Sequence, residues 1–139
     1  MTQRLHTSRG GTPPLKRKSA ITDIVESDPL DRCNKTERLF FDYYLEGTID
    51  YFGATILVQA VRLPLDGGGV YIPDFFQVWE NGAIAYEVKG GYRGAGWEQG
   101  YERFKRAALQ YARDDFQFIL ATFDRKRNEW DIQKWGGRQ

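Results

Sequence analysis

Two carboxylates and a lysine stand in segments that are otherwise patterned like buried β-strands. Asp74 follows Pro73 in YIPDFF, and Glu87 stands two positions before Lys89 in NGAIAYEVKG. Two carboxylates held close together in a partly buried place repel each other, so one takes up a proton unless a cation neutralises both. A hard divalent cation such as Mg²⁺ suits them, because it prefers oxygen ligands and keeps several waters. The residue types therefore predict a metal site with a lysine at its edge.

A predicted hairpin turn decides whether these side chains meet. Asn81 and Gly82 form the dipeptide most typical of a two-residue type I′ turn, and this turn would pair Asp74 with Lys89. Since side chains alternate across a strand, Asp74, Glu87 and Lys89 would then share one face, and the other face would be almost wholly apolar. An alternative is a cross-strand ion pair between Asp74 and Lys89, with Glu87 merely solvated.

Two more charged residues lie on or near the apolar faces of predicted helices. Glu37 shares a helical face with Phe40 and Tyr44, where packing alone would favour an apolar residue. It also has capping-box spacing from Asn34, so an alternative role is to bond the start of its own helix. Lys105 lies near the buried face of the second predicted helix, and the alternative there is a lysine whose stem packs while its ammonium group reaches solvent.

Length and composition limit the classes of protein and of metal site. The 139 residues are enough for one domain with a single core. Cys33 is the only cysteine and His6 the only histidine, which excludes an internal disulfide framework and a multi-cysteine zinc site. Any metal must therefore be held by oxygen. No apolar run approaches the roughly 20 residues of a membrane span, and the N-terminus lacks a secretory signal, so a cytoplasmic protein is expected.

The first part of the chain is basic, although the net charge of the whole is only +1. We expect residues 1–33 to form a flexible basic arm that lies along phosphates, with a solvated tail as the alternative. Residues 34–139 are expected to form the folded domain. The cations of the arm stand among Gly, Pro, Ser and Thr, and they are Arg4, Arg9, Lys16, Arg17 and Lys18.

Hydrophobic periodicity predicts the order of elements in the folded domain. Helices are predicted over 34–47, from a capping residue to a glycine, and over 97–112. The resulting αβββαβ order, with an added C-terminal strand, predicts an α/β fold in which helices cover both faces of a mixed sheet. The strands, rich in β-branched and aliphatic residues, are predicted over 54–65, after a turn at 66–69, and over 83–88, 115–123 and 129–135.

The acidic residues and the lysine match a known motif. Pro73 and Asp74, followed by Glu87, Val88 and Lys89, resemble the motif of the PD-(D/E)XK nuclease superfamily: proline-aspartate, then at variable distance an acid, any residue and a lysine. The resemblance implies a restriction-endonuclease-like core. The chain is also similar to small phage and prophage nucleases of the DUF1064 type and, beyond them, to phage endonuclease I, which resolves branched DNA.

The similarity extends over residues 34–135, through the segments NKTERLFFDYYLEG, YIPDFF, NGAIAYEVKG, FKRAALQYA and FQFILAT. Two parts of the chain depart from it. The glycine-rich loop at 90–100 is longer than the family pattern, and the basic arm lies outside the match. Substrate contacts made by either part are therefore not implied by the resemblance.

The resemblance implies a role for each residue of the motif. Asp74 and Glu87 would bind the catalytic metal, assisted by the carbonyl of Val88. Glu37 would be a further metal ligand, or a ligand to water on the ion. Lys89 would orient the attacking water or help to deprotonate it. The implied cofactor is Mg²⁺, with Mn²⁺ as a substitute.

The implied activity is metal-dependent hydrolysis of phosphodiester bonds in DNA, with branched DNA such as Holliday junctions as the expected substrate and a homodimer as the expected assembly. If the protein is phage-encoded, it would act in the host cytoplasm. Alternatives are a noncatalytic DNA- or partner-binding module on a nuclease scaffold, a nuclease of this fold with a restriction, repair or packaging role, and an RNA substrate. Candidate phosphate-binding residues, which position a duplex without reading its sequence, are Lys16, Arg17, Lys18, Arg93, Arg103, Lys105 and Arg106.

Overall fold

A five-stranded mixed sheet forms the centre of the computed structural model, which describes residues 28–91 and 94–137. The strand order is β1-β4-β5-β6-β7, and only β5 and β6 are parallel. A helix joins these two strands, as a parallel connection requires. The strands are β1 Thr55–Val58, β4 Phe75–Trp79, β5 Gly82–Lys89, β6 Phe116–Asp124 and β7 Glu129–Trp135.

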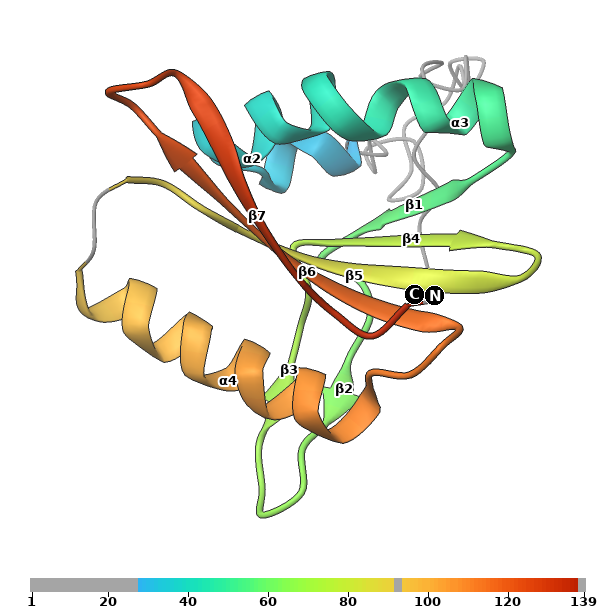
Figure 1. Ribbon diagram of the computed structural model, residues 1–139, viewed down its shortest axis with the longest axis vertical. Helices are drawn as coiled ribbons and strands as arrows, with labels where there is room; N and C mark the ends of the chain where they lie inside the picture. The colour runs from blue at the N-terminus through green and yellow to red at the C-terminus, as the bar shows by residue number, and fades with distance from the viewer. Residues whose placement is uncertain (1–27, 92–93, 138–139) are drawn as a thin grey trace, which may run out of the picture.

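Helices cover both faces of this sheet (Figure 1). One face carries α2 (Lys35–Phe40), the π-helical η2 (Phe41–Leu45) and α3 (Glu46–Phe52), preceded by the 3₁₀ turn η1 (Pro29–Arg32). The other face carries α4 (Ala95–Tyr111). The predicted α/β class, the mixed sheet and the covering of both faces are thus confirmed, as are the second helix and the two last strands.

Each face of the sheet has its own apolar core. Phe40, Phe75 and Tyr86 belong to the core beneath α2 and η2. Phe104 and Phe118 belong to the core beneath α4. Alternation along the strands produces this division, because Phe75 and Tyr86 are paired and point to the same side. The face predicted to be apolar is therefore a true core face.

The predicted strand over 54–65 is interrupted. β1 ends at Val58, and Gln59 has a positive φ of 49°, which turns the chain away from the sheet. The chain then forms a separate two-stranded arm from β2 (Leu63–Pro64) and β3 (Val70–Tyr71). Apolar residues continue through this change of direction because both the main sheet and the β2–β3 arm bury side chains. The sequence pattern therefore gave no sign that the strand ends at Val58.

The first helical segment is longer than predicted. It continues past Gly47 to Phe52 and ends at Gly53, whose φ of 64° is the left-handed conformation of a helix C-cap. Ile49 packs against the core from the extra turn. The predicted end at Gly47 was wrong because burial of a further apolar side chain outweighs the cost of one glycine inside a helix.

The hairpin between β4 and β5 also differs from the prediction. Its loop is Glu80 and Asn81, since Trp79 pairs with Gly82, and neither loop residue has the positive φ that a type I′ turn requires. Gly82 is needed for another reason. A Cβ there would lie 2.9 Å from the carbonyl oxygen of Asp115, and Ala83 N–H donates to that same oxygen.

The change of turn shifts the pairing by two residues. Phe75 pairs with Tyr86, so extending the ladder by one position places Asp74 opposite Glu87 and not opposite Lys89. The predicted Asp74–Lys89 pair was therefore wrong. The predicted face was right, because side chains repeat with a period of two and a two-residue shift leaves each one on its own side.

Candidate functional site

Three carboxylates and one ammonium group converge where β4 begins and β5 ends. Asp74 lies in the bend just before β4, Glu87 and Lys89 lie on β5, and Glu37 lies in the first turn of α2. Glu37 and Glu87 are only 8% and 6% exposed. Such burial is unusual for glutamate unless its charge is paired with a cation or serves a functional site.

Backbone contacts fix Asp74 in place. Its N–H donates to the carbonyl oxygen of Tyr86 at 3.0 Å, and its Oδ2 accepts the N–H of Val88 at 2.8 Å. Burial, followed by the negative charges of Glu87 and Glu37, holds the pKa of Asp74 well above its ordinary value, and a side-chain hydrogen bond with Glu37 acts in the same direction. The negative charges of Glu87 and Glu37 therefore act on Asp74, which agrees with the repulsion predicted from the sequence for carboxylates that share a site.

Glu87 is held by two partners. Its Oε1 accepts the hydroxyl of Tyr71 at 2.7 Å, and its Oε2 forms an ion pair with Lys89 Nζ at 2.8 Å. Burial raises the pKa of Glu87, while Lys89 and the Tyr71 hydrogen bond oppose that rise. Burial and the charge of Glu87 raise the pKa of Tyr71 well above its ordinary value, so its hydroxyl remains a donor.

Glu37 forms the capping box considered as its alternative role, and it also lies beside Asp74. The capping box is formed, because Glu37 Oε1 accepts the N–H of Asn34 at 3.0 Å and Asn34 Oδ1 accepts the N–H of Glu37 at 2.8 Å. Gln59 Nε2 donates to the same Glu37 oxygen at 3.4 Å. The negative charge of Glu37 nonetheless raises the pKa of Asp74, so this carboxylate also faces the site. Capping therefore fixes the position of this acid at the site.

Helix α4 closes the site from the other side. Lys89 Nζ lies 5.7 Å from the centre of the Trp97 ring, within the range of a cation–π contact. A Cβ at Gly100 would collide with Lys89 Nζ and lie 3.2 Å from Glu87 Oε2. Glycine at this position is therefore what allows the helix backbone to approach the ion pair so closely.

The single cysteine shows how negative this region is. Burial raises the pKa of Cys33 to about 12, and the charges of Glu37 and Asp74 add to the effect. A thiol with so high a pKa stays protonated at neutral pH and is a poor nucleophile. Cys33 is therefore no candidate for covalent catalysis.

The predicted phosphate-binding residues are spread over α4 and beyond. Arg103 is exposed, and Lys105 Nζ lies 5.2 Å from the centre of the Tyr101 ring. Arg106 has a structural role, since its guanidinium donates to the carbonyl oxygens of Asp66 and Gly68 at 2.9 Å and holds the β2–β3 arm against the helix. The remaining predicted residues lie outside the described part of the chain; they are Lys16, Arg17, Lys18 and Arg93.

The donor chemistry of the site fits a hard divalent cation. Its carboxylates are oxygen ligands, and the negative charges of Glu87 and Glu37 add to burial in raising the pKa of Asp74. Within residues 28–91 and 94–137, no group of three or more His, Cys, Asp or Glu side chains is arranged to hold a metal ion. Glu87 is instead engaged by Tyr71 and Lys89, so binding a cation would require its side chain to exchange partners. The metal-ligand roles of Asp74, Glu87, Glu37 and the Val88 carbonyl stay predictions.

Sequence reasoning missed several residues that shape the site. Tyr71, Gln59 and Gly100 each contact one of its charged groups or set its limits. Tyr71 stands three positions before Asp74, so its neighbourhood in the sequence was a signal. Gly100 offered a weaker one, because a glycine inside an amphipathic helix costs about 1 kcal/mol relative to alanine and usually has a packing reason.

Comparison of this chain with family models, with curated proteins and with solved structures finds no match. In the described ranges, no helix combines the length and apolar character needed to cross a membrane. A functional assignment must therefore rest on the site itself.

Proposed function

We propose that this protein is a metal-dependent DNA endonuclease with a restriction-endonuclease-like core. The observation that supports this proposal best is the convergence of Asp74, Glu87 and Glu37, which lie close enough to raise the pKa of Asp74, beside the ammonium group of Lys89. Stability alone does not favour this arrangement, because burying several acids together is costly. Function is the reason to keep it.

Asp74, Glu87 and Glu37 would hold Mg²⁺, for which Mn²⁺ would substitute, and the Val88 carbonyl would assist. When bound there, the ion supplies charge neutralisation at a phosphate and acidification of water. Lys89 holds a compact positive charge 2.8 Å from Glu87 Oε2, where it stabilises negative charge that develops on the attacking oxygen or on the phosphate. Tyr71 holds the other oxygen of Glu87 and so fixes the direction of that carboxylate. In-line attack would leave a 5′-phosphate and a 3′-hydroxyl.

Branched DNA such as a Holliday junction is the proposed substrate, because a flexible branch point costs less to deform than intact duplex. Exposed basic residues would bind phosphates and position the DNA without reading its sequence. Two opposed cuts at one junction would require two sites, and hence a homodimer. An action in the cytoplasm, of a host if the gene is viral, belongs to the same proposal.

The test is a cleavage assay in Mg²⁺ on supercoiled, linear and four-way-junction DNA. Asp74→Ala and Glu87→Ala should each abolish cleavage. Glu80→Ala is the matched control, since Glu80 is an exposed acid at the opposite end of the same hairpin. Cleavage that survives both site substitutions would show that the wrong residues were assigned.

A noncatalytic DNA- or partner-binding module is the alternative from another class. It predicts binding without cleavage of any DNA or RNA in Mg²⁺ or Mn²⁺. A restriction, repair or packaging nuclease would cleave the junction and the matched linear duplex at equal rates. The same assay therefore separates the three.

A further inference from the structure

A pocket of about 260 Å³ lies beside the carboxylates, between the start of α4 and strands β6 and β7. We call it the aromatic pocket, and it is lined by Trp97, Tyr101, Leu120, Thr122, Asp131 and Gln133, with Gly90 and Gly91 at its edge. A second pocket, of about 340 Å³, adjoins it because both include Gly91, Thr122 and Asp131. Together they continue the site across the sheet.

Strand register connects the aromatic pocket to the candidate site. Lys89 pairs with Thr122 on β6, and Thr122 pairs with Asp131 on β7. The neighbouring row runs from Glu87 through Leu120 to Gln133. Paired residues of neighbouring strands point to the same face, and strands lie about 4.8 Å apart. The pocket therefore begins one strand away from Lys89 on the face that carries Glu87.

One wall of the pocket is aromatic. The rings of Trp97 and Tyr101 are 5.2 Å apart at 46°. Lys89 lies over the first ring and Lys105 over the second, at 5.7 and 5.2 Å. Cations so close to the rings make this wall attractive to a flat, electron-rich group that brings a phosphate with it.

The opposite wall is polar and carries one carboxylate. It presents the hydroxyl of Thr122, the amide of Gln133 and the carboxylate of Asp131. Asp131 is paired with Arg127 at 3.3 Å, so its charge is partly offset. Hydroxyl, amide and carboxylate groups hydrogen-bond the edge of a nucleobase, whereas a phosphate would need cations there.

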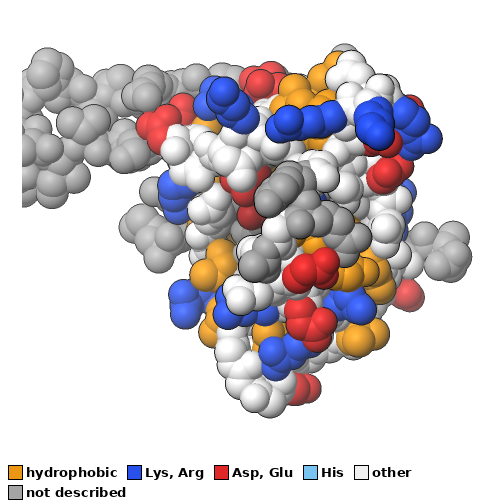
Figure 2. Space-filling model, turned by 90° about the vertical axis from the view of Figure 1, so that its left-hand side faces the viewer, with side chains coloured by type: hydrophobic (Ala, Val, Ile, Leu, Met, Phe, Trp, Pro, Cys, Tyr) orange, Lys and Arg blue, Asp and Glu red, His pale blue; other side chains and the backbone are white. Residues whose placement is uncertain are grey.

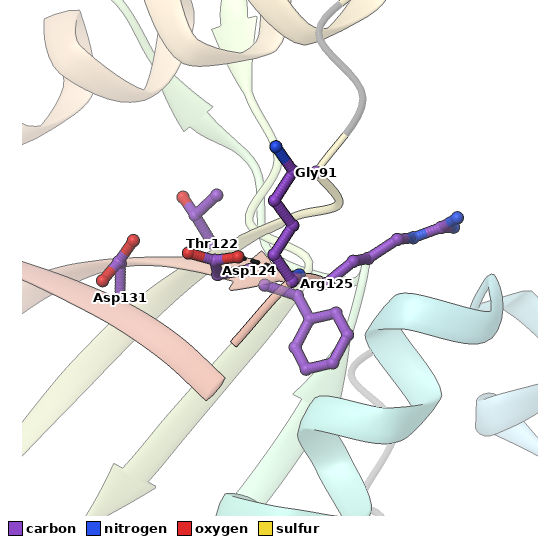
Figure 3. A pocket seen from close by; sticks show the side chains of 7 residues that line it. Gly91, Thr122, Asp124, Arg125 and Asp131 are labelled. Carbon is purple, nitrogen blue, oxygen red and sulfur yellow. Dashed lines mark hydrogen bonds between the residues drawn. The ribbon is translucent and has the colours of Figure 1, made fainter. Parts of the chain in front are cut away.

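Basic residues lie on the far side of the adjoining second pocket. Its lining includes Arg125 and Lys126 from the turn between β6 and β7, and Figure 3 shows Thr122, Asp124 and Asp131 on one flank with Arg125 extending the other way. Arg127 pairs with Asp124 at 3.1 Å and also with Glu129 and Asp131, so one guanidinium offsets only part of the negative charge on this flank. On the molecular face that includes this end of the protein, Lys and Arg side chains gather along the upper edge (Figure 2).

We propose that the aromatic pocket binds a single unpaired nucleobase of DNA, one nucleotide away from the phosphate that is cleaved. Its volume is below that of pockets for drug-sized ligands, which suits one base and little more. A base inside a duplex is stacked on both sides and must be extruded first, which costs a few kcal/mol, and the cost is least for a base that is already unpaired. The pocket would therefore select branch points over intact duplex. This inference rests on the proposed nuclease function.

The test is a DNA-binding experiment in which Ca²⁺ replaces Mg²⁺ as the divalent cation. Cleavage is measured separately, in Mg²⁺. Single abasic nucleotides are placed in turn at each position around the branch of a four-way junction, and affinity is measured by fluorescence anisotropy. One position should lose about tenfold in affinity when its base is missing, in line with base–aromatic stacking. Gln133→Tyr, which fills the pocket, should abolish this difference between base and abasic site.

Ile132→Tyr is the matched control, because Ile132 is the neighbouring residue of β7, is 38% exposed and points to the other face. It should leave the abasic effect unchanged. The proposal that this pocket binds a base would be overturned by any of three results. The wild type fails to bind DNA, no abasic position lowers its affinity, or the abasic effect is equal in Gln133→Tyr and the wild type. If no abasic effect is found but Mg²⁺-dependent cleavage is, the base-binding proposal fails and the proposed nuclease function stands. A clear abasic effect without cleavage of any substrate leaves the pocket standing and removes the nuclease.

Discussion

The backbone of Gly100 lies directly against the ammonium group of Lys89. A Cβ at Gly100 would collide with Lys89 Nζ, and the obstacle is the far end of a flexible side chain rather than fixed backbone. The lysine is therefore able to move aside without unfolding the helix. Helix α4 thus limits where the positive charge of the site is placed, and this limit is open to direct test.

Gly100→Ala should impair cleavage without weakening the fold. Alanine favours a helix over glycine by about 1 kcal/mol, which offsets part of the local crowding. Displacing Lys89 from Glu87 should slow single-turnover cleavage by roughly tenfold or more, since a group that assists proton transfer contributes at least about 10²-fold. Gly96→Ala is the matched control, because Gly96 is in the same helix with open space around it. It should raise the melting temperature and leave the rate unchanged. Equal rates for both variants would contradict the role given to Gly100.

Asp74→Asn should stabilise the metal-free protein at neutral pH. The pKa of Asp74 is raised in the folded state, mainly by burial, so the folded protein binds more protons than the unfolded chain above the ordinary pKa of 3.8. Its contribution to the free energy of unfolding is therefore complete below that value and is lost as pH rises through the folded-state pKa. The neutral amide removes this loss, with a gain of about 1 kcal/mol.

Urea unfolding in the presence of a chelator, at several values between about pH 2.5 and pH 8, measures this effect and covers the acid range in which the control titrates. Asp124→Asn gives a control of opposite sign. Hydrogen bonds from Arg127 and Lys126 lower the pKa of Asp124, so its contribution is present above the ordinary value and is lost as pH falls. If the free energy of unfolding depends on pH identically in the wild type and Asp74→Asn, then Asp74 is not the acid whose pKa is raised on folding.

Mg²⁺ should reverse the order of stability. An ion that binds only the folded state stabilises it, by about 2.7 kcal/mol when its concentration is one hundred times the dissociation constant. We expect Mg²⁺ or Mn²⁺ to raise the melting temperature of the wild type and to have little effect on Asp74→Asn. The readout is independent of activity, so it tests the metal site even if the substrate is wrong. An equal rise in both proteins would place the ion elsewhere.

The face that carries Asp74, Glu87 and Lys89 was predictable from sequence, although the turn was not. Strand alternation sets the face, and it survives the two-residue shift that replaces Asn81 and Gly82 by Glu80 and Asn81 in the loop. The turn was mispredicted because Gly82 is required by the approach of Asp115, a contact with a segment more than thirty residues away. Local preference had no access to it.

Tyr71 illustrates the part of the site that the sequence did not predict. Its hydroxyl reaches Glu87 only because the chain turns away at Gln59, forms the β2–β3 arm and returns beside α4. The apolar pattern of 54–65 is compatible with one uninterrupted strand, and nothing local marks the break. Motif residues were therefore identifiable from their types and spacing, whereas the residues that hold them in place depended on tertiary structure.

The hydrogen bond from Tyr71 should set the acid limit of activity. It opposes the rise in the pKa of Glu87 that burial causes, so Tyr71→Phe should raise that pKa and leave Glu87 protonated up to a higher pH. Cleavage by the variant should then fall more at about pH 6 than at about pH 8, and the acid limb of the pH–rate profile should move to higher pH.

Tyr86→Phe is the matched control, since Tyr86 is buried, donates to Gln77 Oε1 at 2.7 Å and lies on the other face of the sheet. Both substitutions leave a buried acceptor without its donor and should cost about 1–3 kcal/mol of stability. Only Tyr71→Phe should shift the profile, and the same displacement in both variants would mean that lost stability, and not the charge of Glu87, limits the rate at low pH.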